Sequence, residues 1–169
     1  MKKNRFVGRC LAFFLFVVLP SGLIVSCKES DDDLVKRKTI TEVIADNDQF
    51  SILEDVIAHA QMRDALRTGE LTFFAPDNAA FGRANIFSST ALTSLPADSA
   101  RKFLQNHIIP RERLSYTNFV AGKKKSITGR EITFTKTDSV VIVNQNNIIT
   151  PDISAANGVI HIIDSLIVR

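Results

Sequence analysis

The chain has 169 residues, of which 45% are hydrophobic and 23% are charged, and its formal net charge at pH 7 is +3. Four of the 21 basic residues precede residue 27 and no acidic residue does, so 17 basic and 18 acidic side chains remain beyond it. The positive excess therefore belongs to the N-terminal segment, and the rest of the chain gives no reason to expect a nucleic-acid partner.

The first 26 residues have the three parts of a secretory signal. Residues 1–9 are basic, residues 11–19 are wholly apolar, and helix-breaking residues follow. The apolar core fits the usual length of about 7–15 residues and is shorter than the roughly 20 residues of a membrane span. Reading from Cys10 to Ser26 approaches that length, so an uncleaved anchor is the alternative.

Residues 24–27, Ile-Val-Ser-Cys, resemble a bacterial lipobox. The resemblance implies that the sulfur of Cys27 receives a diacylglyceryl group and that cleavage leaves this cysteine as the first residue, carrying acyl chains such as palmitate. The alternative is a chance cysteine beside an ordinary cleavage site. Cleavage would also remove Cys10, so no second thiol would remain for a disulfide and the chain must fold on its hydrophobic core.

Residues 27–38, CKESDDDLVKRK, contain too few apolar side chains to order themselves, and they predict a charged flexible tether. Ser30 and the three aspartates after it resemble the surface-export signal of some Gram-negative lipoproteins. The simpler interpretation is a soluble, self-repelling linker that leaves the lipoprotein facing inward. We expect a lipid-anchored protein of the cell envelope, in the outer membrane, with its domain displayed on the surface.

The spacing of apolar residues predicts helices in the first half of the remaining chain. A short helix covers residues 40–44. A second begins after Asp48 and is expected to end near Gly69, a natural C-terminal glycine. A third begins at Pro96 and is expected to end at Pro110.

Strands dominate the second half, where the apolar period changes to two. A short buried strand is also expected at residues 71–76, followed by a brief helix that begins at Asp77 or Asn78. The later expected strands are Glu131–Thr135, Ser139–Gln145, Ile148–Thr150 after an Asn146-Asn147 turn, and Val159–Val168 after Asn157-Gly158. Helices first and strands second, without βαβ alternation, indicate an α+β fold. We expect one domain over residues 39–169.

Two blocks of this domain resemble the fasciclin family. LTFFAPDNAAF (71–81) looks like the first signature block of fasciclin domains, and SAANGVIHIIDSLIV (154–168) resembles the second. Between them, FLQNHIIP (103–110) matches the helix-ending histidine segment, and Ile127-Thr128-Gly129 lies where a threonine-glycine hairpin is usual. The matching positions are Phe74, Ala75, Pro76, Asn78, Phe81, His107, Asn157, Gly158, Val159, Ile160 and His161. The resemblance implies N-terminal helices packed on a strand-rich β wedge.

We expect these positions to have chiefly structural roles. Phe74 and Phe81 are expected to anchor strand and helix to one core. In the last strand, Val159 and His161 share one face and Ile160 the other, so this strand is expected to be central and covered on both sides. Some animal fasciclin domains carry a tyrosine-histidine motif linked to integrin binding. Here Asn106 precedes His107 and the single tyrosine is Tyr116, so an integrin-type function is unsupported.

The three histidines, His59, His107 and His161, offer little sign of catalysis or metal binding. The last two lie in apolar patterns and are expected to be core residues with hydrogen-bonded rings. A zinc site needs three or four converging ligands, and no such spacing occurs. Ser165 follows His161 and Asp164 closely, but neighbours on a strand face apart.

Two charged stretches have simple explanations. Asp46-Asn47-Asp48 begins like a calcium loop, but Phe50 at the fifth position breaks the pattern. Lys123–Lys125 could meet phosphate or anionic lipid, and we expect instead a solvated hairpin tip.

The sequence therefore predicts a lipid-anchored, non-catalytic adhesion or binding module, monomeric and without a cofactor or metal. Its partners are the membrane, through Cys27, and a polysaccharide or protein at the cell surface. The alternatives are a protein that binds a small ligand or lipid, an unrecognised hydrolase, or an accessory subunit of an outer-membrane complex. A pocket with converging polar groups would favour the first two.

Overall fold

The computed structural model describes residues 36–168. The expected signal segment, Cys27 and most of the tether lie outside the described residues, as does Arg169. In chain order, with η for a 3₁₀ helix, the elements are α1 (Ile40–Ala45), η1 (Asp48–Phe50), α2 (Ser51–His59), η2 (Ala65–Arg67), β1 (Leu71–Pro76), α3 (Asn78–Arg83), α4 (Thr90–Thr93), α5 (Ala97–Asn106), β2 (Ile108–Pro110), η3 (Tyr116–Asn118), β3 (Gly122–Lys125), β4 (Glu131–Thr137), β5 (Val140–Val143), β6 (Asn146–Ala155) and β7 (Gly158–Ile163).

The seven strands form one curved sheet in the order β2-β1-β7-β6-β5-β4-β3. β1 and β7 run parallel, and all other neighbouring strands are antiparallel. The two edges approach each other, because the N–H of Ile127, just after β3, donates to the carbonyl of Ile108 in β2 at 3.0 Å. The sheet therefore comes close to closing into a barrel.

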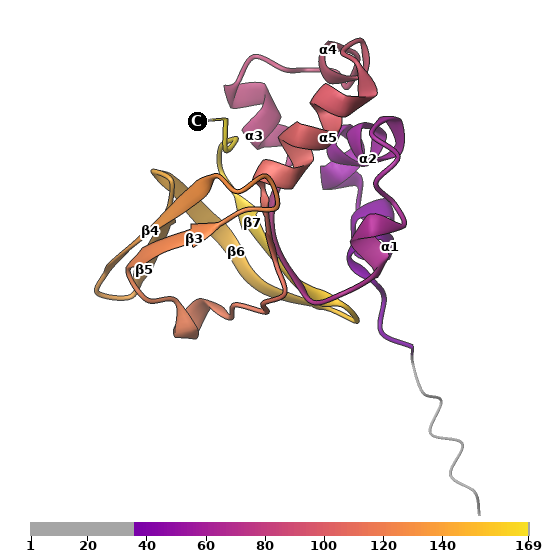
Figure 1. The fold of residues 1–169 in the computed structure, drawn as a ribbon. Helices are drawn as coiled ribbons and strands as arrows, with labels where there is room; N and C mark the ends of the chain where they lie inside the picture. Colours follow the sequence, from indigo (N-terminus) through magenta and orange to yellow (C-terminus); the bar gives the residue numbers. More distant parts are fainter. Residues whose placement is uncertain (1–35, 169) are drawn as a thin grey trace, which may run out of the picture. The chain divides into compact units, whose positions relative to one another are not determined.

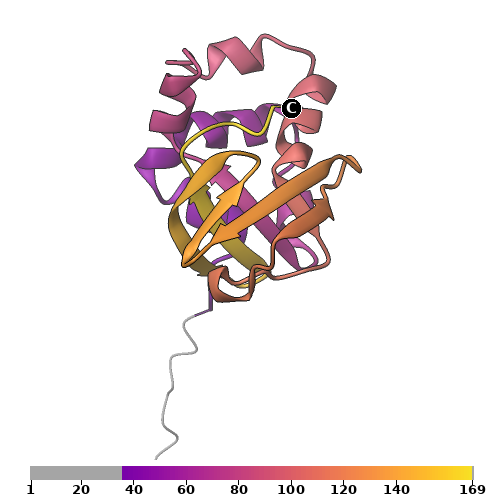
Figure 2. The same ribbon diagram turned by 90° about the vertical axis from the view of Figure 1, so that its left-hand side faces the viewer.

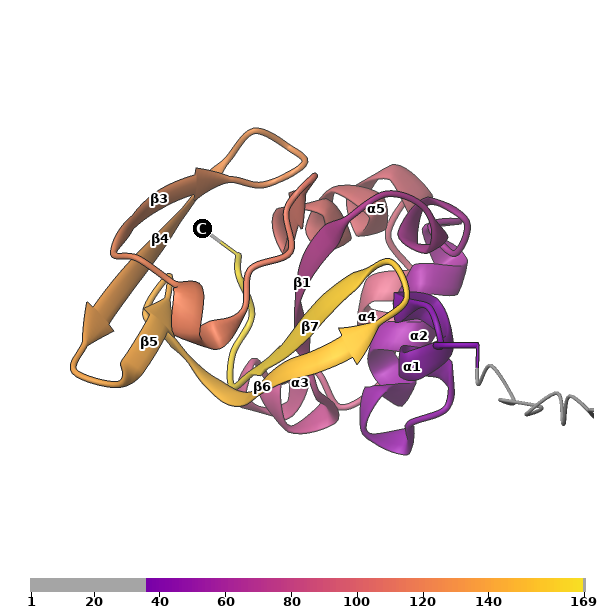
Figure 3. The ribbon, with the colours of Figure 1, turned by 90° about the horizontal axis from the view of Figure 1, so that it is seen from below.

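The helices gather on one side of β1 and β7, and the curled strands β3, β4 and β5 lie on the other (Figures 1 and 3). The described residues belong to one compact unit. This arrangement confirms the predicted α+β fold of a single domain. β7 lies between β1 and β6 and all six of its residues are buried, as expected for a central strand.

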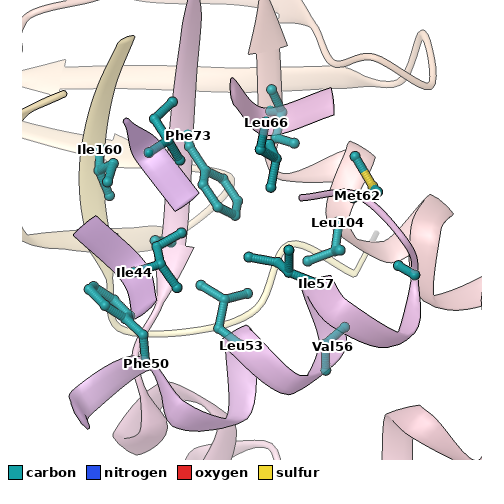
Figure 4. Packing of buried hydrophobic residues seen from close by; sticks show 14 of the residues in the cluster. Ile44, Phe50, Leu53, Val56, Ile57, Met62, Leu66, Phe73, Leu104 and Ile160 are labelled. Atoms are coloured by element: carbon teal, nitrogen blue, oxygen red, sulfur yellow. The ribbon is translucent and has the colours of Figure 1, made fainter. Parts of the chain in front are cut away.

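β1 divides two hydrophobic clusters, because successive side chains of a strand point to opposite faces. Phe73 and Ala75 belong to the larger cluster, which the helices cover, whereas Phe74 belongs to the smaller one with Phe119 and Phe134. Figure 4 shows the larger cluster, in which Leu53 and Ile57 of α2 point toward Phe73. Each cluster thus depends on β1 for an aromatic side chain at its centre.

The expectation that Phe74 and Phe81 share one core is wrong. Phe81 lies in the helix-covered cluster, and Phe74 lies in the cluster enclosed by the curled strands. The reason is the alternation along β1, which directs Phe73 toward Phe81 and its neighbours and Phe74 away from them.

α2 ends ten residues before the predicted glycine. Gln61 adopts a left-handed conformation with φ 55°, and its N–H donates to the carbonyl of Ala58. The N–H of Met62 donates to the carbonyl of Ile57, which completes a Schellman motif. Gly69, at φ 76°, serves a later turn before β1.

α5 ends at Asn106, four residues before Pro110. A residue that precedes proline is biased toward extended backbone, which disfavours continuing the helix through Ile109. Instead, Ile108 and Ile109 extend and pair with Phe73 and Thr72 of β1. Within residues 36–168, no helix has the length and apolarity that crossing a membrane requires.

Two predicted turns are also corrected. The turn between β5 and β6 is Asn144-Gln145, where both residues have positive φ (48° and 70°), and Asn146 already begins β6. Asn146 is instead buried, and its side-chain amide donates to the carbonyl of Ser165 at 3.2 Å. β6 then continues to Ala155 through two register shifts.

Lys123–Lys125 do not form a hairpin tip. They lie within the edge strand β3, and the tip follows at residues 126–130, where Gly129 has φ 83°. The threonine-glycine hairpin is thus where the fasciclin resemblance puts it. The last strand also stops at Ile163, because Asp164 turns its carboxylate onto the backbone and side chain of Asn147.

Candidate functional site

His107 follows the last turn of α5, and both of its ring nitrogens are hydrogen-bonded inside the core. Its Nε2 accepts from the N–H of Ile167 at 2.9 Å. Because a backbone N–H only donates, the proton must be on Nδ1, which donates to the carbonyl of Phe103 at 2.8 Å. Burial lowers the pKa of His107 from 6.5 to about 4. The ring is therefore neutral at pH 7.

His161, in β7, is held in the opposite tautomer. Its Nδ1 accepts from the N–H of Asp152 at 3.2 Å, so Nε2 carries the proton and donates to the carbonyl of Leu114 at 2.8 Å. Burial lowers the pKa of this ring as well. Phe74 stacks on it with a centroid distance of 5.6 Å. Both histidines are thus hydrogen-bonded core residues, as their sequence pattern predicts.

The structure does not bring Ser165, His161 and Asp164 together as a nucleophilic site. The His161 nitrogens are occupied by backbone groups, and the Asp164 carboxylate bonds Asn147. His59 is half-exposed, with its Nε2 at 2.8 Å from the carbonyl of Leu95. Among the residues that the structure describes, no three His, Cys, Asp or Glu side chains are grouped to hold a metal ion.

The residues of the first motif organise the start of the helices. The Asp77 Oδ1 accepts from the N–H of Ala80 at 2.7 Å, so Asp77, rather than Asn78, caps α3. The Asn78 amide donates to the carbonyl of Asp48 at 3.0 Å and accepts from the N–H of Ile52 at 3.2 Å. Asn78 therefore ties α3 to the beginning of α2, which is a structural role.

The calcium-like stretch is likewise structural. The Asp46 carboxylate pairs with Lys38 at 2.7 Å, and the Asn47 side chain accepts from the N–H of Gln49 at 3.4 Å. These oxygens cap helices and pair with a lysine, so they do not converge on a common point.

Asn157 and Gly158 join the second motif to the rest of the domain. The Asn157 side chain accepts from the N–H of Ile40 at 3.0 Å and donates to the carbonyl of Leu66 at 2.8 Å. A Cβ on Gly158 would lie 2.2 Å from the carbonyl oxygen of Leu71. A glycine is therefore required for β7 to approach β1.

A hollow of about 660 Å³ opens beside the C-terminal segment and is the best candidate for a binding site. Its lining residues are Thr133, Thr135, Asn144, Gln145, Leu166, Ile167 and Val168. No binding residue was expected here, although the second fasciclin-like block, expected to be structural, ends at residue 168. The signal that could have identified it is the row of threonines on the outward face of β4, beside a turn of two polar amides.

The hollow lies far from the point where the chain enters the domain. The carbonyl of Lys38 accepts from the N–H of Ala156 at 2.8 Å, in the turn that precedes β7. Residues 166–168 follow the opposite end of that strand, and six residues of strand span about 20 Å. A ligand in the hollow would therefore be held at the end of the domain away from residue 38.

Comparison with known proteins identifies the family. The model of the fasciclin domain matches residues 48–169. Protein sll1483 of Synechocystis is 36% identical over 132 residues, which cover 76% of this chain and 72% of that protein. The pig transforming growth factor-beta-induced protein ig-h3 is 28% identical over 130 residues, 76% of this chain but 19% of its own length.

A solved structure supports the fold independently. The FAS1 domain pair from the insect cell adhesion molecule Fasciclin I superimposes with a TM-score of 0.66 at 18% identity, over 80% of this chain and 52% of that chain. Together with the match over residues 48–169, the sheet order and the buried motif residues, this shows that the chain belongs to the fasciclin domain family.

Proposed function

We propose that the chain is a lipid-anchored, non-catalytic adhesion or binding module of the cell envelope. The observation that carries the proposal is the placement of the hollow at one end of β7 and of Lys38 at the other. A tether that joins the domain at residue 38 would be attached at the end opposite to the hollow, so it would leave the hollow accessible to a partner. The similar fold in an insect cell adhesion molecule agrees with this function.

Anchoring through Cys27 supplies the membrane partner. Two acyl chains suffice for stable anchoring, and a processed lipoprotein carries more than one. The 12 residues from Cys27 to Lys38 reach up to ~40 Å when extended. One weak binding site per molecule then acts through avidity, because many copies share one membrane.

The absence of catalysis in this proposal is supported by the chemistry of the buried histidines. Both rings are neutral and each nitrogen has a backbone partner. A general base needs a nitrogen within reach of substrate, so neither His107 nor His161 can act without leaving its position.

The anchor is tested by replacing Cys27 with alanine in the full chain expressed in a Gram-negative host. We expect the variant to leave the membrane fraction, because no sulfur remains for acylation. Cys10→Ala is the matched control and should stay membrane-bound, since it lies in the segment that cleavage removes. Retention of Cys27→Ala in membranes would refute the anchor.

Display and adhesion need a separate experiment. Protease added to intact cells should remove the domain if it is displayed, and full protection would place it on the inner side. Beads coated with the chain from residue 28 should bind envelope fragments, and soluble chain should compete. Treating the fragments with protease or with periodate then tells a protein partner from a polysaccharide. Beads that bind no better than uncoated ones would overturn the adhesion proposal.

The hollow also favours a second candidate, the binding of a soluble small molecule. Its volume of about 660 Å³ falls within the usual range of ligand sites, about 300–1,000 Å³. This function predicts that the protein purified from its own envelope carries a small molecule in native mass spectra. If the purified chain carries no small molecule and the coated beads bind envelope fragments, the result favours adhesion instead.

A further inference from the structure

The basic side chains of the domain are concentrated in one segment of the chain. Residues 111–136 contain seven basic and two acidic side chains, whereas the other described residues contain eight basic and twelve acidic ones. This segment includes β3, which is the edge strand, and β4 beside it. The domain is thus nearly neutral in sum, but its basic residues are unevenly distributed along the chain.

One of these lysines, Lys123, lies beside a residue that lines the hollow, and Lys125 follows it on the same face of the strand. Lys123 and Lys125 project from the same face of β3, because side chains alternate along a strand. Their partners on β4 are Thr133 and Glu131, and directly opposed Cβ atoms in such pairs lie roughly 4.5–5.5 Å apart. Thr133 lines the hollow, so Lys123 stands at its rim. Figure 2 looks onto this side, with the strands in front and the C-terminal segment above them.

The charge on this face is available to a ligand. Lys124 turns to the other face, where its Nζ lies 2.6 and 2.7 Å from the two carboxylate oxygens of Glu112. Lys123 pairs with Glu131 at 2.8 Å, but both side chains are more than half exposed, and such pairs contribute little. Lys125 and Arg130 are exposed and make no ion pair within the part of the chain that the structure describes.

The hollow itself is lined without any charged side chain. Thr133, Thr135 and Gln145 supply hydroxyl and amide groups that both donate and accept hydrogen bonds. The Oδ1 of Asn144 accepts from the N–H of Thr133 at 2.7 Å, so this residue offers its NH₂ group as a donor. Leu166 and Val168 supply apolar surface. A sugar ring matches this combination, because it carries hydroxyls around its rim and C–H groups on its faces.

We propose that the β3–β4 face binds an acidic polysaccharide, with a sugar ring in the hollow and carboxylate or sulfate groups at Lys123 and Lys125. This inference rests on the proposed adhesion function and names the chemistry of its partner. The lysines attract and orient the polymer, and the neutral groups of the hollow select for sugar. A polymer also suits avidity, since its repeats engage several anchored copies.

The lysines have one simpler explanation, which the experiment must separate from binding. Lysines on an edge strand prevent it from pairing with another sheet. That role requires charge on β3 but no ligand and no participation by Thr133 or Thr135. An anionic membrane is the other partner that charge alone would attract.

The test uses the chain from residue 28, whose described part forms one compact unit with both hydrophobic clusters. Binding is measured by calorimetry to polygalacturonate, to neutral dextran and to phosphatidylglycerol vesicles. We expect binding to polygalacturonate alone, weakened by 0.5 M NaCl, at which concentration the Debye length is only about 4 Å. The double variant K123Q/K125Q should raise its Kd at least about tenfold, or about 1.4 kcal/mol.

Two further variants make the result specific. K36Q/K102Q removes the same charge from exposed sites elsewhere and should change the Kd less than about twofold, which is below 0.5 kcal/mol. T133V/T135V keeps the charge and the β propensity but removes two hydroxyls, and it should weaken polygalacturonate binding. Thermal melting confirms that each variant is folded.

Several outcomes would overturn the inference. They are equal weakening by K36Q/K102Q, unchanged binding of T133V/T135V, equal binding of dextran, and binding to vesicles but not to polygalacturonate. Coated beads that still bind envelope fragments while polygalacturonate fails would reject this ligand and leave the adhesion proposal standing.

Discussion

His107 and His161 each join two segments of backbone through one imidazole ring. His107 connects the end of α5 to Ile167, which is 60 residues later, and His161 connects β6 to Leu114, which is 47 residues earlier. The apolar pattern around each histidine predicts burial. It cannot predict the partners or the tautomers, because these depend on backbone groups that only the tertiary fold brings near.

The His107 ring should make stability depend on pH. The pKa of His107 is about 4 in the folded state, whereas an ordinary histidine has a pKa of 6.5, so the unfolded chain binds the proton more readily between these values. Stability is therefore lost as the pH falls. We expect the free energy of unfolding to decrease by about 3 kcal/mol from pH 7 to pH 4 through this residue, and His161 acts in the same direction. Urea titrations across that range measure the change.

Matched variants test whether His107 causes this pH dependence of stability. His107→Gln removes the titrating ring and should give a flatter profile with lower stability at pH 7. His59→Gln, at a half-exposed position outside the core, is the matched control for the loss of an imidazole ring. A profile that stays equally steep in His107→Gln would show that other groups are responsible.

Gly158 illustrates a second constraint at the residue scale. Gly158→Ala places a Cβ 2.2 Å from the Leu71 oxygen and 2.8 Å from a methyl of Ile40, so β1 and β7 must separate. We expect a loss of about 3 kcal/mol or more, or failure to fold, measured by urea denaturation. Gly82→Ala, inside α3, meets only the edge of Phe87 at 3.7 Å and should be neutral or stabilising. Equal effects of the two substitutions would contradict this account.

At the scale of elements, helix starts and buried strands were easier to predict than helix ends. Asp77 caps α3, and LTFFAP forms β1, because both depend on residues adjacent in sequence. α2 instead ends just before Gln61, which adopts a left-handed conformation. Glutamine rarely adopts this conformation, so the residue type gives no sign of it. Burial of Met62 in the helix-covered cluster offsets that strain, and such a long-range contribution is invisible in a local pattern.

The end of α2 can therefore be improved. Gln61→Gly places the preferred residue at the left-handed position and should stabilise the domain by about 0.5–1 kcal/mol. Ala58→Gly, three residues earlier on the exposed side of the helix, should destabilise it by about 1 kcal/mol. Thermal melting of the two variants beside the parent gives the comparison, and a destabilised Gln61→Gly would refute the Schellman explanation.

The candidate site was the least predictable element. Its lining comes from β4, the turn before β6 and the C-terminal segment, and the turn was expected two residues later than it occurs. Two successive asparagines at 146 and 147 suggested a turn, but tertiary hydrogen bonds to the carbonyls of Ser165 and Leu166 hold Asn146 in a strand. The apolar patterns predicted β1, β4, β5 and β7, whereas the edge strands β2 and β3 and the site at the margin of the sheet were not predicted.

At the scale of the whole molecule, the two clusters share β1 and β7. Phe73 and Phe74 are neighbours in sequence but support different clusters, and Ile162 and Ile163 repeat this division on β7. Neither cluster can lose these strands and persist. The domain should therefore unfold in one step.

Two probes can test this cooperativity. The chain has one tyrosine and no tryptophan, so its fluorescence reports on Tyr116, which packs against the smaller cluster. Far-UV circular dichroism is dominated by the helices that cover the larger one. Urea unfolding curves from the two probes should coincide in the parent chain and in the variants Phe73→Ala and Phe74→Ala. Each substitution should lower the free energy of unfolding by about 3–5 kcal/mol. Curves with separate midpoints would show that the clusters unfold independently.

The contact between Lys38 and the β6–β7 turn has a mechanical consequence. Tension on an N-terminal anchor enters at Lys38 and first meets two hydrogen bonds, from Ala156 to Lys38 and from Ile40 to the side chain of Asn157. Unwinding the six residues of α1 would then lengthen the chain by about 10 Å, once Ile40 and Ile44 have left the helix-covered cluster. The parallel ladder of β1 and β7 takes the force only afterwards. A pulled domain would thus extend beside its anchor while the hollow at the other end keeps its shape.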